Sequence, residues 1–401
     1  MLKPALVLKA HTMAVGIVRA LGEMGVPIIL FRYDEQDIAH KSRYVKEVIQ
    51  VPHPEKHEDE FIDILLKQKD RFAGGFLVPS SDETLAVIAR HKERLSEYFV
   101  VACPDWDIVS RYIEKKHTYR LAEALGVPVP KTVVPTSVED VERYAADIEF
   151  PCLVKPSQSH LFYEQFKRKM VPVQNLNEMI AVYRQAAEYN LEVMLQEIIP
   201  GNDDAVVNYN AYAWEGQSLL EFTARHIRNA PPLWGSPRVA QSEWIPEIIE
   251  SGRKALQSIG FYGYACTEFK RDARDGIYKL MEINGRHNLS GLLAVRCGIN
   301  FPWLHYRHLM HGEVPLGARF REGVYWIDLT RDVGFSLTHF RQEKYSLSDY
   351  LKPYFKPHVF AIWDIRDMKP FIARIISLGK QALKTKRAYE PTLQGTEAER
   401  L

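Results

Sequence analysis

The stretch from Tyr278 to Ser290, YKLMEINGRHNLS, places three polar side chains where a strand ends. Glu282 and Asn284 are two residues apart, so in a strand both point to the same face, and Arg286 follows after two more residues. A carboxylate and an amide carbonyl are oxygen ligands that suit a hard divalent cation such as Mg²⁺. The stretch is equally compatible with a polar edge strand that ends in a turn at Gly285, and both interpretations stay open on this fragment alone.

A second carboxylate precedes this stretch in the segment YACTEFKRD, which ARDG joins to IYKLMEIN. If the two strands pair antiparallel about a loop centred on Asp275, Glu268 lies opposite Glu282. Two facing carboxylates repel each other unless a cation lies between them. The sequence therefore predicts that Glu268, Glu282 and Asn284 bind one or two Mg²⁺ ions, with phosphate oxygens and water as the remaining ligands. This sparse set fits a metal that arrives with a nucleotide.

Cations and a hinge for a nucleotide lie earlier in the chain. Lys155 ends an apolar strand in FPCLVKPS, and Lys115 precedes a helix in EKKHTYR, so both suit the phosphates. In VMLQEIIPGND a strand runs into Pro200 and Gly201, where strand pairing must stop. The backbone groups freed there can read an adenine edge, and Asp203 can accept from ribose hydroxyls. Taken singly, these features are also compatible with solvated lysines and a plain turn.

The first 105 residues alternate between strand and helix signals. The expected strands are PALVLKA, VPIILFR and GGFLVPS, and the expected helices are TMAVGIVRALGEMG, EDEFIDILLKQK and SDETLAVIARHKERL. This alternation predicts a parallel sheet flanked by helices, as in a Rossmann-type domain. The first turn, KAHTMAVG, has no GxGxxG, so we do not expect a dinucleotide site. In PSSDE we interpret Ser81 as a helix cap in preference to part of an anion site.

The pattern of helix and strand signals changes from Asp107 onward. A helix through KKHTYRLAEAL stops at Gly126, and the Pro-rich VPVPKTVVP marks a boundary. Two further helices alternate with the strands FPCLVKP and EVMLQEII, and a helix over PEIIESGRKALQSIG precedes the two late strands. The end of the chain, RDMKPFIARIISLGKQALKTKR, predicts a basic amphipathic helix that either packs on its own domain or lies on an anionic membrane surface.

Length and composition exclude several classes of protein. With 401 residues, 46% hydrophobic and 26% charged, the chain is typical of a globular protein of two or three domains. Lys+Arg 52 against Asp+Glu 51 gives no reason to expect a nucleic-acid partner. The first apolar run is shorter than a secretory or membrane segment, and the cysteines have no metal or redox spacing (Cys103, Cys152, Cys266, Cys297). We expect a cytoplasmic protein, with association at the inner face of the membrane left open by the basic helix.

The order of these features resembles the ATP-grasp superfamily. Along the chain, the features are a lysine in the helix that ends at Gly-x-Pro-x-Pro and a lysine at the end of a strand. A QEIIPG hinge followed by an acidic residue, a strand Glu and finally E-x-N-x-R come after them. Over about residues 1–312 the chain is similar to the carboxylate-amine ligase branch, which includes D-aspartate-ligase-like and carbamoyl-phosphate-synthase-like proteins. The resemblance implies a mixed α/β (α+β) ATP-grasp fold. Its expected parts are a Rossmann-like parallel-sheet domain (1–106), an antiparallel lid subdomain (107–200), a large antiparallel-sheet subdomain with the metal site (201–314) and a C-terminal extension with the basic amphipathic helix (315–401).

The resemblance also implies a role for each candidate residue. The implied ATP-binding set is Lys115 and Lys155 for the phosphates, the backbone of Gln196, Glu197 and Ile199 for adenine, and Asp203 for ribose. The implied metal set is Glu268, Glu282 and Asn284, with Mg²⁺ as the ion and Mn²⁺ as its alternative. The implied catalytic cations are Arg286 and Arg225, which would steady the transferred phosphoryl group and the substrate carboxylate.

The activity implied by the resemblance is ATP- and Mg²⁺-dependent ligation of a small-molecule carboxylate to an amine. The carboxylate attacks the γ-phosphorus to give an acyl phosphate, and the amine then displaces phosphate, so no nucleophilic side chain is required. Three alternatives stay open: a carboxyphosphate-forming enzyme of the biotin-carboxylase or carbamoyl-phosphate type, a non-catalytic ATP-binding protein, and a nicotinamide-dependent oxidoreductase. The sequence leaves open whether the protein forms a homodimer.

Two features depart from the family pattern. The loop after Lys155, SQSHLFYEQFKRKM, lacks a Gly-rich run, so side chains such as His160 would have to serve there. The usual Asn-Pro-Arg is Asn284-Gly285-Arg286 in this chain, which changes the backbone but keeps the arginine.

Overall fold

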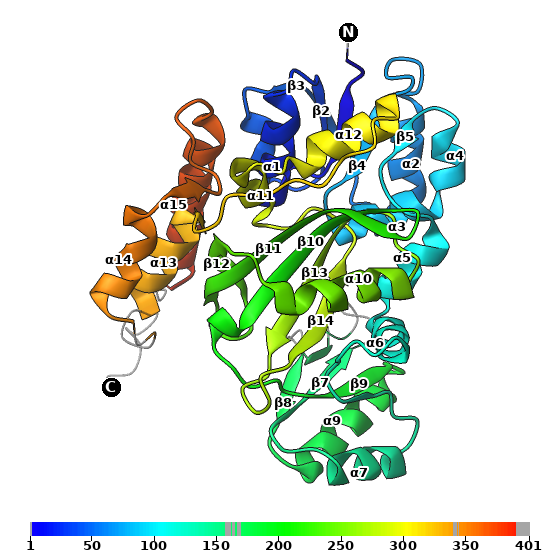
Figure 1. The fold of residues 1–401 in the computed structure, drawn as a ribbon, viewed down its shortest axis with the longest axis vertical. Helices are drawn as coiled ribbons and strands as arrows, with labels where there is room; N and C mark the ends of the chain where they lie inside the picture. The colour runs from blue at the N-terminus through cyan, green and yellow to red at the C-terminus, as the bar shows by residue number, and fades with distance from the viewer. Residues whose placement is uncertain are drawn as a thin grey trace, which may run out of the picture.

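Three β-sheets organise the chain in the computed structural model, which describes residues 2–156, 162, 165–166, 170–339, 343 and 345–389. Figure 1 shows a sheet near the N-terminus, a long central sheet, and a smaller sheet below it with its own helices. The N-terminal sheet has the strand order β3-β2-β1-β4-β5, the small sheet β6-β9-β7-β8, and the large sheet β14-β13-β10-β11-β12-β15-β16.

The N-terminal sheet is parallel throughout. Its strands are β1 (Ala5–Leu8), β2 (Ile28–Arg32), β3 (Val45–Gln50), β4 (Phe76–Pro79) and β5 (Val100–Val101). The helices are α1 (Thr12–Gly22), α2 (Glu58–Leu66), α3 (Asp82–Arg90) and α4 (Lys92–Ser96), with a 3₁₀ turn η1 (Ala39–Lys41). Every residue of β1 and β4 is buried, as expected for parallel strands covered by helices on both faces. The expected alternation is confirmed, whereas β3 and the short β5 were not predicted.

The small sheet is antiparallel in all its pairings. Its strands are β6 (Thr132–Val133), β7 (Cys152–Pro156), β8 (Val171–Val173) and β9 (Val193–Glu197), with α7 (Val138–Ala146) and α9 (Leu176–Glu188) packed on it. The helices α5 (Trp106–Ile113) and α6 (Lys115–Ala124) precede it. Because the sheet starts at β6 and ends at β9, only residues 126–131 and 198–205 connect it covalently to the rest of the chain.

The large sheet contains the two late strands and extends into the C-terminal part of the chain. Its strands are β10 (Val206–Trp214), β11 (Gln217–Ala230), β12 (Ser236–Ser242), β13 (Gly263–Arg271), β14 (Tyr278–Asn284), β15 (Tyr325–Ile327) and β16 (His358–Phe360). The associated helices are η2 (Asp203–Ala205), η3 (Pro246–Ile248), α10 (Ile249–Ser258), α11 (Gly291–Cys297) and α12 (Phe301–His311). Since β15 and β16 pair with this sheet, part of the predicted 315–401 extension is integrated into it. The proposed domain boundaries themselves remain predictions.

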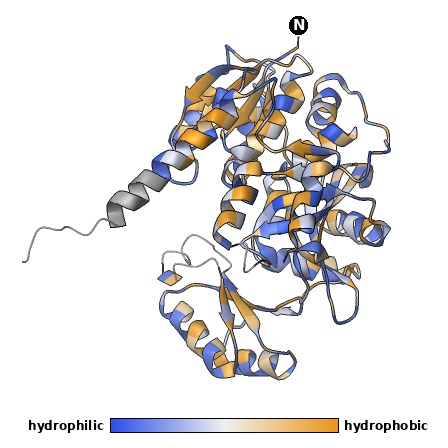
Figure 2. Cartoon of the chain, turned by 90° about the vertical axis from the view of Figure 1, so that its left-hand side faces the viewer, coloured by the Kyte–Doolittle hydropathy of each residue, from blue (hydrophilic) through white to orange (hydrophobic). Residues whose placement is uncertain are grey.

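The last helices are α13 (Leu329–His339), α14 (Leu347–Phe355) and α15 (Lys369–Tyr389), and buried ion pairs hold α13 and the segment before α15. Arg228 of β11 binds Asp332 of α13 at 2.8 Å, and both side chains are almost fully buried. Arg19 of α1 binds Asp367, just before α15, at 3.0 Å in an equally buried pair. Among the described residues, no helix combines the length and apolar character needed to cross a membrane. Figure 2 shows the mixed hydropathy of the helices in this part.

Candidate functional site

The carboxylates of β13 and β14 meet as the sequence predicts. In the antiparallel pair Glu268 lies directly opposite Glu282, so the two side chains share one face of the large sheet. Asn284 donates from Nδ2 to Glu282 Oε1 at 2.9 Å, and Arg286 donates from Nη2 to Asn284 Oδ1 at 3.1 Å. The predicted clustering of these four residues is therefore confirmed.

The electrostatics of this pair favour a bound cation. Burial and the neighbouring Glu282 raise the pKa of Glu268. Burial also opposes ionisation of Glu282, but Lys115, the hydrogen bond from Asn284 and Arg286 together lower its pKa. Among the described residues no group of three or more His, Cys, Asp or Glu forms a complete metal cage. Two carboxylates and one amide oxygen are instead the kind of donors that Mg²⁺ takes when nucleotide phosphates and water complete its octahedron.

The two predicted phosphate lysines point toward the same space from different elements. Lys115, the first residue of α6, lies 3.3 Å from Glu282 Oε2, and this carboxylate raises its pKa. Lys155 of β7 donates to Gln196 Oε1 at 2.5 Å. Burial and the repulsion of Lys115 lower the pKa of Lys155 to about 7. Lys115 is paired with Glu282, whereas Lys155 has only the neutral Gln196 as its hydrogen-bond partner among the described residues, so an ATP phosphate would supply the anion that Lys155 lacks.

The predicted hinge residues lie at the end of β9. The side chain of Gln196 is buried and donates to Thr132 Oγ1 at 2.8 Å, while the N–H of Glu197 donates to Lys131 O at 3.1 Å. Ile199 is buried just beyond the strand. The backbone contacts to adenine therefore remain predictions, with part of the Glu197 backbone already engaged.

The Glu197 side chain belongs to a charged cluster that the sequence analysis did not find. It binds Arg274 Nη2 at 2.7 Å and Lys279 Nζ at 3.2 Å, and Asp272 binds both of these cations as well. This cluster ties the end of β9 to the β13–β14 turn. Arg274 and Asp272 lie in the predicted turn ARDG and just before it, where their proximity to β9 depends on tertiary contacts.

The carboxylate of Asp203 accepts hydrogen bonds from the backbone of its own chain. Its Oδ2 accepts from the N–H of Asn229 at 2.8 Å, and its Oδ1 accepts from the N–H of Leu233 at 2.6 Å. Both oxygens thus stabilise the connection from β11 to β12. The structure supports this role, and the contact of Asp203 with ribose stays a prediction.

Arg225 is not brought to the carboxylates. Glu268 is paired with Asn208 of β10, whereas Arg225 is paired with Val207, the next residue of that strand. Because adjacent residues of a strand point to opposite faces, Arg225 lies on the face away from Glu268. There it binds Glu243 through two bonds of 2.7 and 2.8 Å and donates to Asp204 O. This geometry gives no support to the expected role of Arg225 as a cation for the transferred phosphoryl group or the substrate carboxylate.

Arg286 connects the carboxylate face to the N-terminal domain. It forms a bidentate pair with Asp82 at the first turn of α3, with both distances 2.8 Å. Asp82 belongs to the PSSDE stretch, so the polarity of that stretch was the available signal. The interpretation of Ser81 as a helix cap is confirmed, since its side chain accepts from the N–H of Thr84.

Two histidines flank this junction. Burial, together with Lys9 and Arg286, lowers the pKa of His11 to about 3, and burial lowers the pKa of His287 to about 3. His287 stacks on Tyr264 with ring centroids 4.1 Å apart. Because both pKa values lie well below 7, both rings are neutral near pH 7.

A steric reason explains why glycine stands at position 285, between Asn284 and Arg286. A Cβ at position 285 would overlap the hydroxyl and ring of Tyr112 of α5. Tyr112 is buried there, so only glycine fits between Asn284 and Arg286. The other departure, at His160, lies outside the described residues.

Comparisons with known proteins agree with this geometry. No protein-family model matches the chain. The D-aspartate ligase of Enterococcus faecium (strain Aus0004) is 28% identical over 256 residues, which cover 60% of this chain and 61% of that protein. The D-alanine–D-alanine ligase of Ectopseudomonas mendocina (strain ymp) is 26% identical over 208 residues, covering 48% and 63% respectively. The chain therefore spans less than two thirds of the length of these relatives.

Solved structures decide the fold. The biotin carboxylase of Campylobacter jejuni, in complex with β-γ-ATP, superposes with a TM-score of 0.63 at 15% identity, covering 80% of this chain and 74% of that one. The chain has the ATP-grasp fold. The L-amino acid ligase of Bacillus licheniformis superposes with a TM-score of 0.59 at 16% identity, covering 78% and 75%. The biotin carboxylase domain dimer of Hydrogenobacter thermophilus 2-oxoglutarate carboxylase, in complex with MgADP, gives 0.59 at 19% identity, covering 80% and 73%.

The ATP-grasp likeness agrees with the arrangement of sheets described above. A small antiparallel sheet stands against a large one, with two lysines and two glutamates between them. The fold class predicted from the sequence is thereby confirmed.

Proposed function

We propose that the chain is an ATP- and Mg²⁺-dependent ligase that joins a small-molecule carboxylate to an amine through an acyl phosphate. The observation that carries this proposal is the Glu268–Glu282 pair, which shares one face of the large sheet with Asn284 and Arg286 and receives Lys115 from α6. The likeness to D-aspartate, D-alanine–D-alanine and L-amino acid ligases supports this reaction class over carboxyphosphate chemistry.

Each side chain has a role in this proposal. Lys115 and Lys155 bind the phosphates of ATP, and Glu268, Glu282 and Asn284 hold the metal. Bound Mg²⁺ would neutralise charge on the transferred phosphoryl oxygens. Arg286, held by Asp82 and Asn284, presents a fixed cation to the reacting carboxylate or phosphoryl group. Fixed cations of this kind lower the barrier because charge grows on oxygen in both chemical steps. Arg225 takes no part in the reaction as we propose it.

The remaining roles follow the sequence predictions. The backbone of Gln196, Glu197 and Ile199 contacts the adenine, and Asp203 contacts the ribose while its oxygens also accept from the N–H groups of Asn229 and Leu233. Mn²⁺ replaces Mg²⁺ as an alternative ion. A homodimer is the proposed assembly, because a structural neighbour was determined as a dimer.

Peripheral membrane contact through α15 is a separate part of the proposal. Ile372, Ile375 and Ile376 are each about half exposed at 50, 49 and 54% on this helix, which also carries Lys369 and Lys380. An exposed apolar stripe beside basic residues suits an anionic lipid surface. Co-sedimentation with phosphatidylglycerol vesicles tests it, and equal recovery of wild type and Ile375→Glu with the vesicles would refute it.

The test of the ligase proposal is ADP release measured with paired substrates. Free amino acids, beginning with D-aspartate and D-alanine, and amines including amino-terminal peptides are offered singly and in pairs with MgATP. We expect ADP release that requires one carboxylate and rises with one amine. Release that depends on bicarbonate instead would identify carboxyphosphate chemistry, and no release above the Glu282→Gln background with any pair would contradict the ligase proposal.

A further inference from the structure

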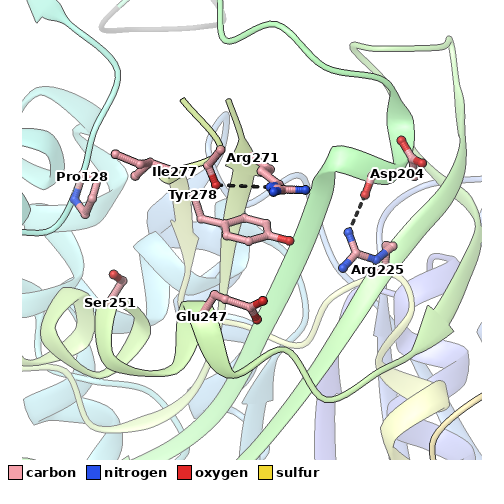
Figure 3. A pocket seen from close by; sticks show the side chains of 9 residues that line it. Pro128, Asp204, Arg225, Glu247, Ser251, Arg271, Ile277 and Tyr278 are labelled. Carbon is pink, nitrogen blue, oxygen red and sulfur yellow. Dashed lines mark hydrogen bonds between the residues drawn. The ribbon is translucent and has the colours of Figure 1, made fainter. Parts of the chain in front are cut away.

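A cavity opens on the face of the large sheet that points away from the carboxylates. It has a volume of about 520 Å³, within the range of small-molecule sites. Its lining comes from β11, β13, β14 and the turn between the last two strands, from η2, η3 and the start of α10, and from the segment before β6; its charged side chains are Arg225, Arg271, Glu247 and Asp204. Figure 3 shows these side chains around one opening, with Arg271 and Tyr278 above Glu247.

The register of the sheet places this cavity behind the ATP-grasp site. Arg225 is opposite Val207, Val207 is opposite Phe269, and Arg271 is opposite Tyr278. Paired residues share a face, and residues two apart in a regular strand do so as well. In β14 the register shift between Glu268 and Phe269 breaks this alternation, so that Tyr278 lies on the face opposite to Glu282. The cavity residues of the strands therefore lie on the reverse face, together with Tyr209, whose ring packs against Gly252 of α10.

The cavity offers charges of both signs that have no partner of their own. Arg271 is exposed, donates from Nε to Gly276 O at 3.2 Å and forms no ion pair with any residue that the structure describes. Within the same described part of the chain, the carboxylates of Glu247 and Asp204 take part in no hydrogen bond or ion pair. Arg225, by contrast, is neutralised by Glu243.

Because the cavity presents both a cation and carboxylates, it favours a ligand that carries charges of both signs, a zwitterion, over a purely anionic one. A polyphosphate or dicarboxylate would meet the carboxylates of Glu247, Asp204 and Glu243, so a strongly anionic ligand is disfavoured. A free amino acid can instead place its carboxylate on Arg271 and its ammonium group on Glu247, which lies below Arg271 and Tyr278 in Figure 3. Pro128, Ile277 and the ring of Tyr278 offer apolar surface for its side chain.

The cavity also touches both connections of the small sheet. Pro128 belongs to the segment 126–131, and Asp204 belongs to the segment 198–205, which are the two links between this sheet and the rest of the chain. Pro128 O accepts from the N–H of Leu280 at 2.8 Å, and Pro200 O accepts from the N–H of Ala273 at 3.2 Å. The β13–β14 hairpin thus holds both connections, one through Leu280 of β14 and the other through Ala273 of the turn, and the Glu197 cluster adds ion pairs to β9.

We propose that a free amino acid binds in this reverse-face cavity and, by contacting both connections, fixes the small sheet relative to the large one. Its binding is coupled to that of the nucleotide, because the same turn supports the predicted adenine hinge. A ligand that favours one position of the small sheet must change nucleotide affinity, and the nucleotide must change its affinity by the same factor. A regulatory effect on ligation rests on the proposed function, whereas the binding site itself does not.

Calorimetric titration of the full chain with individual free L- and D-amino acids, in the absence of ATP, tests the site directly. We expect at least one to bind, and we expect its affinity to fall at least about tenfold in Arg271→Gln and in Glu247→Gln, since each loses one charge-assisted bond. Arg94→Gln serves as the matched control, because Arg94 is an exposed arginine of α4 with a distant 3.7 Å partner, Asp63. The methyl ester and the N-acetyl derivative of the binding amino acid should each lose affinity.

The variant Glu282→Gln separates this cavity from the ATP-grasp site. Binding that survives Glu282→Gln but is lost in Arg271→Gln supports the proposal. Binding lost in Glu282→Gln and kept in Arg271→Gln would place the amino acid on the carboxylate face and overturn the proposal, as would the absence of any binding. An affinity for MgADP that does not change, within twofold, at saturating amino acid would overturn the coupling. Because none of these measurements follows ADP release, their failure is distinct from failure of the ligase proposal.

Discussion

The two faces of the large sheet carry different chemistry although adjacent residues of the same strands build them. Glu268 faces Glu282 and the lysines of the small subdomain, whereas Phe269, the next residue, lies on the face of Arg225 and the 520 Å³ cavity. On the carboxylate face charges converge from four segments of the chain. On the reverse face Arg225, which is paired with Glu243, and Arg271, which forms no ion pair with a described residue, line the cavity in which we propose that a free amino acid binds. Alternate residues of a strand face opposite sides of the sheet, so the register decides which face a charged side chain occupies. Two charged residues that are neighbours in sequence can therefore belong to different sites.

The largest effect is expected for Glu282→Gln on the carboxylate face. The change keeps the shape of the side chain but removes the charge that faces Glu268 and binds Lys115. We expect ATP turnover to fall at least about 100-fold, as when a fixed charge at a reacting centre is lost. ADP release measures the effect, and thermal unfolding by circular dichroism checks that the fold persists.

The reverse face supplies the control for this change. Glu243→Gln removes a carboxylate that binds only Arg225 among the side chains of the described residues. It should leave turnover within a fewfold of wild type. Equal losses in the two variants would break the distinction between the faces, and full activity in Glu282→Gln would remove the metal assignment.

The next effect concerns the lysine that the small subdomain directs toward the carboxylate face. Lys155→Ala should weaken ATP affinity about 10- to 100-fold, since a charge-assisted bond to phosphate contributes about 1.5–3 kcal/mol. Calorimetry with ATP measures the loss. Lys116→Ala is the control, because Lys116 pairs with Glu192 at 2.8 Å in an exposed ion pair. An unchanged affinity in Lys155→Ala would contradict its phosphate role.

A pH dependence follows from the same lysine. Burial and Lys115 lower the pKa of Lys155 to about 7, and bound phosphates would favour its charged form and raise that pKa again. Above pH 7 nucleotide binding should therefore take up a proton. Affinity should fall by up to about tenfold per pH unit as the pH rises, because the protonation must accompany binding.

This linkage is measured by titrating ATP with EDTA present, at pH 8, in two buffers of different ionisation enthalpy. The difference in apparent binding enthalpy reports the protons taken up. Lys155→Ala should take up fewer protons than wild type. The same uptake in both proteins would assign the proton to another group.

The smallest effect is expected for Arg225→Gln on the reverse face. Since Arg225 lies away from Glu268, turnover should change by no more than a fewfold, and stability should fall by about 1 kcal/mol or less for a partly exposed ion pair. Arg286→Gln, made for comparison, should lose turnover about 100-fold. Similar turnover losses in the two variants would show that the face of the sheet does not separate their roles.

Much of the fold was predictable because its signals are local. Strand and helix alternation in the first 105 residues follows from hydrophobic periodicity, and it predicted every strand of the parallel sheet except β3 and the short β5. β3 carries alternating polar residues, VKEVIQ, and is only partly buried, so its pattern was weaker. The cap at Ser81 was equally predictable, because a helix cap involves residues three apart.

The candidate site divides in the same way. The pairing of Glu268 with Glu282 depends on one hairpin and its turn, so sequence spacing was sufficient. The pair of Arg286 with Asp82 joins residues more than 200 positions apart, and no local pattern encodes it. Asp203, expected as a ribose ligand, binds two backbone N–H groups of a segment more than 25 residues away.

The sequence by itself determined the elements and the spacing of the late strands, because both depend on side-chain periods of two and about 3.6 residues along one chain. Only the tertiary structure decided which face Arg225 occupies, why glycine stands beside Tyr112, and how the β13–β14 turn holds the small sheet. These features depend on register and packing between distant segments. A shift of one residue in register moves every side chain of a strand to the other face, and no single segment contains the information that fixes that shift.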